Sequence, residues 1–150
     1  MPYIIDKNTI LVIKSNNNTI IYDNKEKHVI RRKIEDVLND CCKYYGSSLK
    51  GRIEGTNYLL GSIYKAPIII SEYQEIIMFP TSSFKCDDCM WINYAWIEKY
   101  FCDDNKTFII FKNGLKIEIN ISTKIINNQI LRSSRLESIL KSKNRWFCFF

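Results

Sequence analysis

The residues best suited to chemistry in this chain are six cysteines, a single histidine and a glycine-rich basic segment. Cys86 and Cys89 have the spacing at which two thiolates can reach one tetrahedral zinc ion. A complete zinc site needs two more ligands, and the sequence has no second CxxC or HxxxH pair. We therefore expect free, partly buried thiols and no bound metal, and we keep a small zinc or thiol protein as an alternative.

Motifs for catalysis are missing from the sequence. His28 lies between Lys27 and Val29, and no serine or cysteine beside it forms a nucleophile pair. The segment 46–52 reads GxxxxGR, which lacks both the lysine and the hydroxyl residue that a phosphate-binding P-loop needs. We expect a protein that is not an enzyme, with no catalytic residue and no cofactor.

Charge is unevenly placed along the chain. The net formal charge is +6, and residues 124–150 carry six basic residues against one acidic residue. Residues 43–65 carry four against one, whereas residues 71–123 carry five against eight. Two basic segments on either side of an acidic middle predict a localised anion-binding face. A lysine-rich solvated surface is the alternative interpretation.

Hydropathy at the N-terminus and along the chain bears on the location of the protein. No apolar run approaches the roughly 18 residues of a membrane span. The first residues have neither the basic region nor the cleavage site of a signal peptide. The sequence therefore predicts a cytoplasmic protein with no membrane partner.

The hydrophobic pattern predicts the elements that must position these residues. Alternating and β-branched runs predict strands at residues 9–14, 19–22, 67–71, 75–79, 91–97, 107–112 and 115–121, and Asn113-Gly114 predicts a hairpin turn. Helical spacing predicts helices at 31–45, capped by Gly46, and at 125–141, with an apolar stripe of Ile126, Ile130, Leu136 and Leu140. We expect residues 1–150 to form one α+β domain with a mostly antiparallel sheet and two main helices.

The segment Gly46–Thr56 lies between these elements and has two interpretations. Its three glycines and three hydroxyl residues favour a close approach to another backbone, and they are equally compatible with a turn into a short helix. Two tryptophans further along are an odd number of residues apart, at Trp91 and Trp96. On a regular strand they would face opposite sides, so we expect at least one of them in the core.

A set of short motifs occurs in a fixed order along most of the chain. Residues 42–56 fit the pattern C-x-[FY]-[FY]-G-S-S-x-x-G-R-x-x-G-T. They are followed by Lys65-Ala66-Pro67-Ile68, Phe79-Pro80-Thr81, Cys89-Met90-Trp91-Ile92, Phe111-Lys112-Asn113-Gly114 and Asn128-Gln129-Ile130-Leu131-Arg132. This ordered set resembles the competence transcription factor (ComK) family, and the resemblance is strongest over residues 30–140.

The resemblance implies a transcriptional activator of genetic competence and DNA-uptake genes in Gram-positive bacteria. Members of the family bind paired A/T-rich promoter boxes of double-stranded DNA, largely through the minor groove, as multimers and without catalysis. For this chain the resemblance implies double-stranded DNA as partner, a homo-oligomer, contact with the transcription machinery and a nucleoid-associated location. Narrow A/T-rich minor grooves attract Arg and Lys side chains. We therefore expect DNA contacts from Ser47, Ser48, Lys50, Arg52, Asn128, Arg132 and Arg135.

The C-terminal residues suggest a further alternative. Longer family members continue well past the position of Leu140, whereas this sequence ends at Phe150. A truncated, non-activating paralogue that acts as a protein–protein interaction module is therefore the alternative function. Large aromatic side chains left in water would form a sticky patch, so we expect them to pack on the domain or on a second copy of the chain, and the multimeric family favours the second copy. They are Trp146, Phe147, Phe149 and Phe150.

Overall fold

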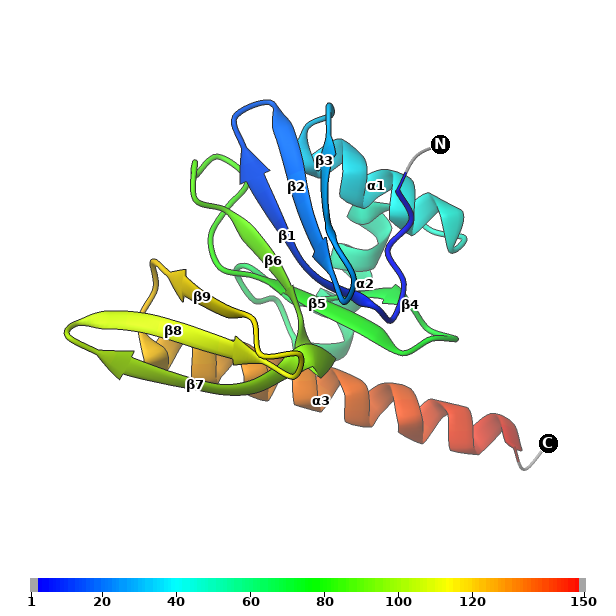
Figure 1. The fold of residues 1–150 in the computed structure, drawn as a ribbon. Helices are drawn as coiled ribbons and strands as arrows, with labels where there is room; N and C mark the ends of the chain where they lie inside the picture. The colour runs from blue at the N-terminus through cyan, green and yellow to red at the C-terminus, as the bar shows by residue number, and fades with distance from the viewer. Residues whose placement is uncertain (1–2, 149–150) are drawn as a thin grey trace.

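The computed structural model describes the backbone of residues 3–148 and the side chains of residues 3–143. Within this range, two antiparallel sheets pack with three helices (Figure 1). The larger sheet has the order β3-β2-β1-β6-β5-β4 and contains β1 (Thr9–Ser15), β2 (Asn18–Asp23), β3 (Lys27–Ile30), β4 (Ile68–Ser71), β5 (Ile76–Pro80) and β6 (Met90–Asn93). The smaller sheet contains β7 (Ile97–Asp103), β8 (Lys106–Phe111) and β9 (Lys116–Ile119). The helices are α1 (Ile34–Tyr44), α2 (Leu49–Leu60) and α3 (Thr123–Cys148).

In the large sheet, β1, β4, β5 and β6 are largely buried on both faces. Successive side chains of a strand point to opposite sides, so each of these strands contributes to two hydrophobic layers. One face, which includes Val12 and Trp91, packs with the apolar side of α1. The opposite face, which includes Leu11 and Ile92, packs with the smaller sheet and the start of α3. The α+β class with antiparallel sheets is therefore confirmed, as is the burial of Trp91. No helix in residues 3–148 combines the length and the apolar character that crossing a membrane requires.

Two strand predictions need correction. β3 was not predicted, because its sequence shows no alternation of apolar and polar residues. It forms an edge of the large sheet by pairing with β2, and its Lys27 and Val29 side chains are exposed. The predicted strand 91–97 ends at Asn93, whose side chain accepts a hydrogen bond from the Ala95 backbone N–H and begins a 3₁₀ turn. This turn redirects the chain into the second sheet. The hairpin at Asn113-Gly114 is confirmed, with Gly114 at a φ of 89°.

The main correction is α2, since two main helices were expected and residues 3–148 form three. The chain leaves α1 through Gly46, at a φ of 89°, and Ser48 then caps α2 by accepting a 3.0 Å hydrogen bond from the Gly51 backbone N–H. Leu49 and Ile53 pack on the core beside α1. The segment 46–56 is thus a turn into a helix, which is the second of its two interpretations.

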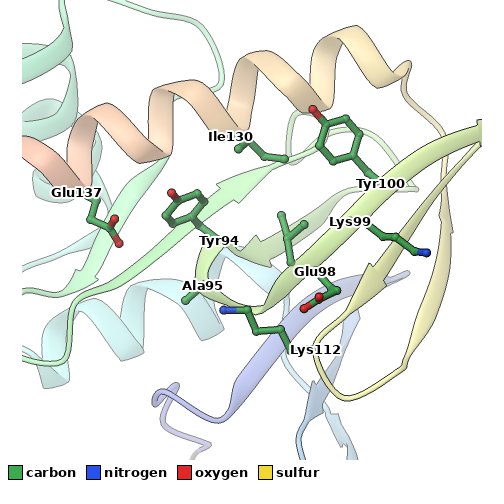
Figure 2. A pocket seen from close by; sticks show the side chains of 9 residues that line it. Tyr94, Ala95, Glu98, Lys99, Tyr100, Lys112, Ile130 and Glu137 are labelled. Atoms are coloured by element: carbon green, nitrogen blue, oxygen red, sulfur yellow. The ribbon is translucent and has the colours of Figure 1, made fainter.

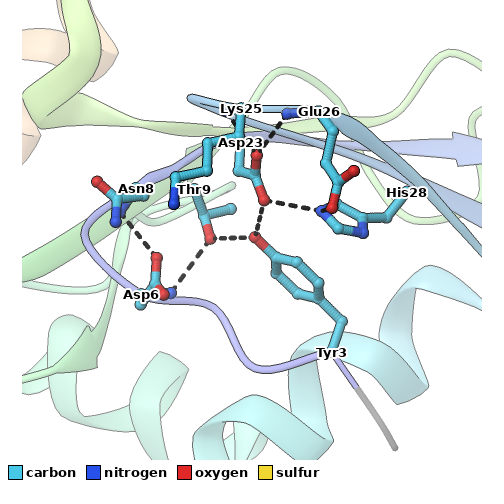
Figure 3. Close-up of polar contacts among 8 residues, drawn as sticks. All are labelled: Tyr3, Asp6, Asn8, Thr9, Asp23, Lys25, Glu26 and His28. Atoms are coloured by element: carbon cyan, nitrogen blue, oxygen red, sulfur yellow. Dashed lines mark hydrogen bonds and ion pairs between the residues drawn. The ribbon is translucent and has the colours of Figure 1, made fainter.

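The N-terminal segment is held to the sheet by a polar cluster (Figure 3). The Tyr3 hydroxyl lies 2.8 Å from Thr9 Oγ1 and donates to Asp23 Oδ2 at 3.3 Å. The same Asp23 oxygen lies 2.7 Å from His28 Nε2. Thr9 is fully buried and also accepts the Asp6 backbone N–H. This cluster brings the one histidine of the chain to a carboxylate, and its hydroxyl groups are engaged in the same network.

Acidification should weaken this anchor. Burial raises the pKa of the Asp23 carboxyl, but the backbone N–H groups of Glu26 and Lys25 and the His28 side chain outweigh burial, so the pKa is lowered overall. A lowered carboxyl pKa stabilises the fold above the unfolded value of about 3.9, and this stabilisation is lost as pH falls through the folded value. Thermal unfolding between about pH 2 and pH 5 should therefore depend less on pH in Asp23→Asn than in wild type. Parallel curves for the two proteins would contradict this role.

Candidate nucleic-acid interface

The first part of the candidate interface is the N-terminal half of α2. Ser48 caps the helix, Ser47 is half-buried beside it, and Lys50 is exposed in the first turn. The Leu49 backbone N–H is bound by the Asn39 side chain of α1 at 3.0 Å, which fixes the turn between the two helices. The predicted residues Ser47, Ser48 and Lys50 therefore lie together at one helix end.

Arg52 is more enclosed than a groove-inserting arginine was expected to be. Its side chain is only 15% exposed, and Nη1 donates to Glu72 Oε1 at 3.3 Å. Nη2 reaches the Tyr45 backbone carbonyl at 3.5 Å, while Nε is buried without a partner among the described residues. Binding of Arg52 to an outside ligand would thus compete with Glu72 for the guanidinium group.

The second part is α3, which a buried glutamine attaches to the large sheet. Gln129 is 2% exposed, and its Nε2 donates to the Lys65 and Pro80 carbonyl oxygens at 2.8 and 2.9 Å. Its Oε1 accepts Arg132 Nη1 at 3.2 Å, and the same Nη1 donates to the Tyr64 carbonyl oxygen at 3.3 Å. Gln129 therefore holds the helix and one predicted basic side chain together. Sequence reasoning missed it, although a polar residue among the apolar positions of a helix was a visible signal.

The basic residues of α3 lie on two sides of the helix. Arg132 and Lys143 are eleven residues apart, which is close to three full turns, so they share the side toward α2. Asn128 and Arg135 are seven residues apart and share an exposed side turned away from the core. The structure therefore brings Arg132 toward α2 and leaves Asn128 and Arg135 on the adjoining solvent face.

A cavity of about 230 Å³ lies between the two helices. Predicted residues Ser47 and Arg52 line it together with Lys143, which was not predicted. We use the term α2–α3 face for the surface formed by α2, α3 and the connection 61–66. The charged side chains described on these three elements are the basic residues Lys50, Arg52, Lys65, Lys124, Arg132, Arg135, Lys141 and Lys143 and the acidic residues Glu54 and Glu137. Glu72, in the turn after β4, lies beside them through its contact with Arg52. The face has a net positive charge, as the placement of charge in the sequence predicted.

A larger cavity of about 460 Å³ lies on the other side of α3, between the helix and β7 (Figure 2). Glu98 and Glu137 line it together with Lys99 and Lys112, so its charges balance. Tyr100 closes one part by donating its hydroxyl to Asn127 Oδ1 at 2.6 Å. A cavity with balanced charges offers no net electrostatic attraction to a polyanion.

The cysteine pair occupies the loop between β5 and β6. Cys86 is exposed, and the Ser83 hydroxyl lowers the pKa of its thiol. Burial raises the pKa of the Cys89 thiol to about 11. Among the described side chains, no group of three or more His, Cys, Asp and Glu residues is arranged to hold a metal ion. The absence of zinc stays a prediction, as does the packing of the aromatic residues at 146–150, which lie outside the described side chains.

The chain is similar to known proteins over most of its length. A family model described as "ComK protein" matches residues 1–145. The competence transcription factor of Bacillus subtilis (strain 168) is 28% identical over 110 residues, which are 73% of this chain and 57% of that relative. The chain therefore matches little more than half the length of this relative. No solved structure matches the present chain.

Proposed function

Since the chain belongs to the ComK family, we propose that it is a transcriptional activator of competence genes that binds double-stranded DNA and catalyses no reaction. The observation that carries this proposal is the family match over residues 1–145, together with the similarity to the competence transcription factor of Bacillus subtilis. A role on promoters would place the protein in the cytoplasm at the nucleoid, in contact with the transcription machinery.

The α2–α3 face is the proposed DNA-binding surface. It is the net positive surface on which both predicted basic segments meet, which supports binding to a polyanion. A/T-rich minor grooves are narrow and strongly negative, so they favour arginine and lysine over other side chains. We assign the contacts to Ser47, Ser48, Lys50, Arg52, Asn128, Arg132 and Arg135, and we propose that a homo-oligomer reads paired A/T-rich boxes.

A titration with two duplexes tests this function. Purified protein should bind a fluorescent duplex with paired A/T-rich boxes more tightly than a G/C-rich duplex of equal length, as measured by anisotropy. Placing one box instead of two should weaken binding if a homo-oligomer is required. Failure to bind either duplex at low salt would refute DNA binding and favour the protein–protein interaction module.

Arg52→Met should weaken binding to DNA while leaving the stability of the fold nearly unchanged. The Arg52 charge is mostly buried, its partner Glu72 is 62% exposed, and its Nε has no partner among the described residues. A weakly paired buried charge stabilises little, so an apolar side chain of similar length should change the free energy of unfolding by less than about 1 kcal/mol. Affinity for the A/T-rich duplex should fall about tenfold or more. Unchanged affinity combined with lost stability would make Arg52 a purely structural residue.

A further inference from the structure

Two glycines four residues apart on α2 have different surroundings. A Cβ atom built on Gly51 would lie 3.0 Å from Ser47 Oγ and 3.1 Å from Ser48 Oγ, so the capping turn explains this glycine. A Cβ atom built on Gly55 meets nothing within 4 Å in the described part of the chain. Glycine inside a helix is less stable than alanine, so Gly55 weakens α2 without a packing reason inside the protein.

The residue after Gly55 has an unsatisfied polar group. Thr56 is 2% exposed, and its Oγ1 atom has no hydrogen-bond partner among residues 3–143. Buried hydroxyls are nearly always paired, because leaving one unpaired is energetically unfavourable. Thr56 and Gly55 both line the cavity between α2 and α3, and so does Arg52, whose Nε also lacks a partner. Two residues with an unpaired polar atom, Arg52 and Thr56, therefore line the same cavity.

Charge and shape define the ligand. The cavity is lined by two cationic side chains, Arg52 and Lys143, and by one acidic side chain, Glu72. A phosphate diester offers acceptor oxygens and one negative charge, which suits guanidinium, ammonium and hydroxyl donors. Gly55 adds bare backbone, which allows a sugar–phosphate strand to lie directly against the helix. Glu72 is largely exposed, so its side chain can move into solvent when a phosphate takes its place on Arg52.

We propose that this cavity binds one phosphate of the DNA backbone, with Arg52, Thr56 and Lys143 as donors and Gly55 as the point of closest approach. The site rests on the proposed DNA-binding function, since it names the part of the DNA that α2 contacts. It also assigns binding roles to Gly55, Thr56 and Lys143, which the sequence did not single out as contacts.

The pair Gly55→Ala and Gly51→Ala tests the close approach. Gly55→Ala should raise the Tm by about 2–4 °C, because alanine favours the helix and fits the open space. The same variant should bind the A/T-rich duplex about tenfold more weakly, because a methyl group then separates α2 from the strand. Gly51→Ala should raise the Tm less than Gly55→Ala does, because its methyl group crowds the two serine hydroxyls. A more stable Gly55→Ala that binds as tightly as wild type would overturn the proposal.

Two further variants test the donors. Thr56→Val keeps the side-chain shape and removes the hydroxyl, so binding should weaken about tenfold with little change in salt dependence. Lys143→Gln should reduce the slope of log affinity against log salt by about 1, the value for one lost phosphate contact. Lys106→Gln is the matched control, because Lys106 begins β8, and the turn between β7 and β8 lies at the end of the smaller sheet away from α2 (Figure 1). If Lys143→Gln behaves like Lys106→Gln and Thr56→Val binds normally, the cavity holds no phosphate.

An inorganic phosphate titration separates this site from the proposed function. In NMR spectra at constant ionic strength, phosphate in place of chloride should shift the Gly55 and Thr56 amide signals, and Thr56→Val should abolish the effect. If wild type binds no duplex, the proposed function fails, and saturable phosphate shifts would still support an anion site. Absence of those shifts would overturn the site. Phosphate shifts combined with unchanged DNA binding by Gly55→Ala would assign the cavity to a free phosphate and overturn the DNA assignment.

Discussion

Gln129→Leu should lower the free energy of unfolding by about 2–5 kcal/mol, because it removes two hydrogen bonds and leaves their carbonyl acceptors without a donor. The Pro80 carbonyl belongs to β5 and the Lys65 carbonyl to the connection before β4, so one side chain ties α3 to both. Leucine matches the size of glutamine but offers no donor. The loss should therefore come from unpaired polar groups rather than from a cavity.

Urea unfolding followed by circular dichroism measures this effect. Ser134→Leu is the matched control, since Ser134 is exposed on the same helix and should change stability by less than about 0.5 kcal/mol. A Gln129→Leu variant within about 1 kcal/mol of wild type would mean that the two carbonyls find other donors. Because Gln129 also accepts from Arg132, the variant should also weaken DNA binding in conditions where it remains folded.

Binding to the A/T-rich duplex should weaken by about 10²–10³-fold when salt is raised from 50 to 200 mM. About five phosphate contacts would follow from the basic residues of the α2–α3 face, and each contact adds about 0.9 to the slope of log affinity against log salt. Anisotropy titrations at four salt concentrations give this slope directly. A slope near zero would show that the face contacts few phosphates.

The double variant Arg132→Gln/Arg135→Gln identifies the surface. It should lower the slope by about 2, since two cations are removed. Lys99→Gln/Lys112→Gln removes two cations from the balanced cavity on the other side of α3, and its slope should match wild type (Figure 2). Equal slopes for the two double variants would place the DNA on another surface.

Strong local signals made much of the fold predictable. The Asn113-Gly114 turn and the alternation after it predicted β8 and β9, because both the turn and the buried face are encoded within a few residues. The helix α2 was harder to predict, because Gly51 and Gly55 lower its intrinsic helix stability. It is stabilised instead by packing of residues such as Leu49 and Ile53 on the core. β3 depends on pairing with β2, a tertiary contact that sequence periodicity does not reveal.

The candidate site was predictable in its residue types but not in its contacts. The basic residues and the glycine-rich segment were visible in the sequence, and the structure places Ser47 and Arg52 at one cavity. The Glu72 partner of Arg52 and the contribution of Lys143 come from elements far away in sequence, so spacing could not reveal them. Whether these residues contact DNA stays a prediction.

The junction between β1 and β6 has a consequence for how the chain folds. Leu11 pairs with Ile92 and Val12 with Trp91, about 80 residues apart, whereas the other strand pairs join segments close in sequence. Closing so long a loop costs entropy before its contacts form, so this pairing should limit the folding rate. Leu11 and Ile92 belong to one hydrophobic cluster, and Val12 and Trp91 to another. These two clusters, the ones that face each other across the large sheet, are therefore completed in the same step, and the chain should unfold in a single cooperative transition.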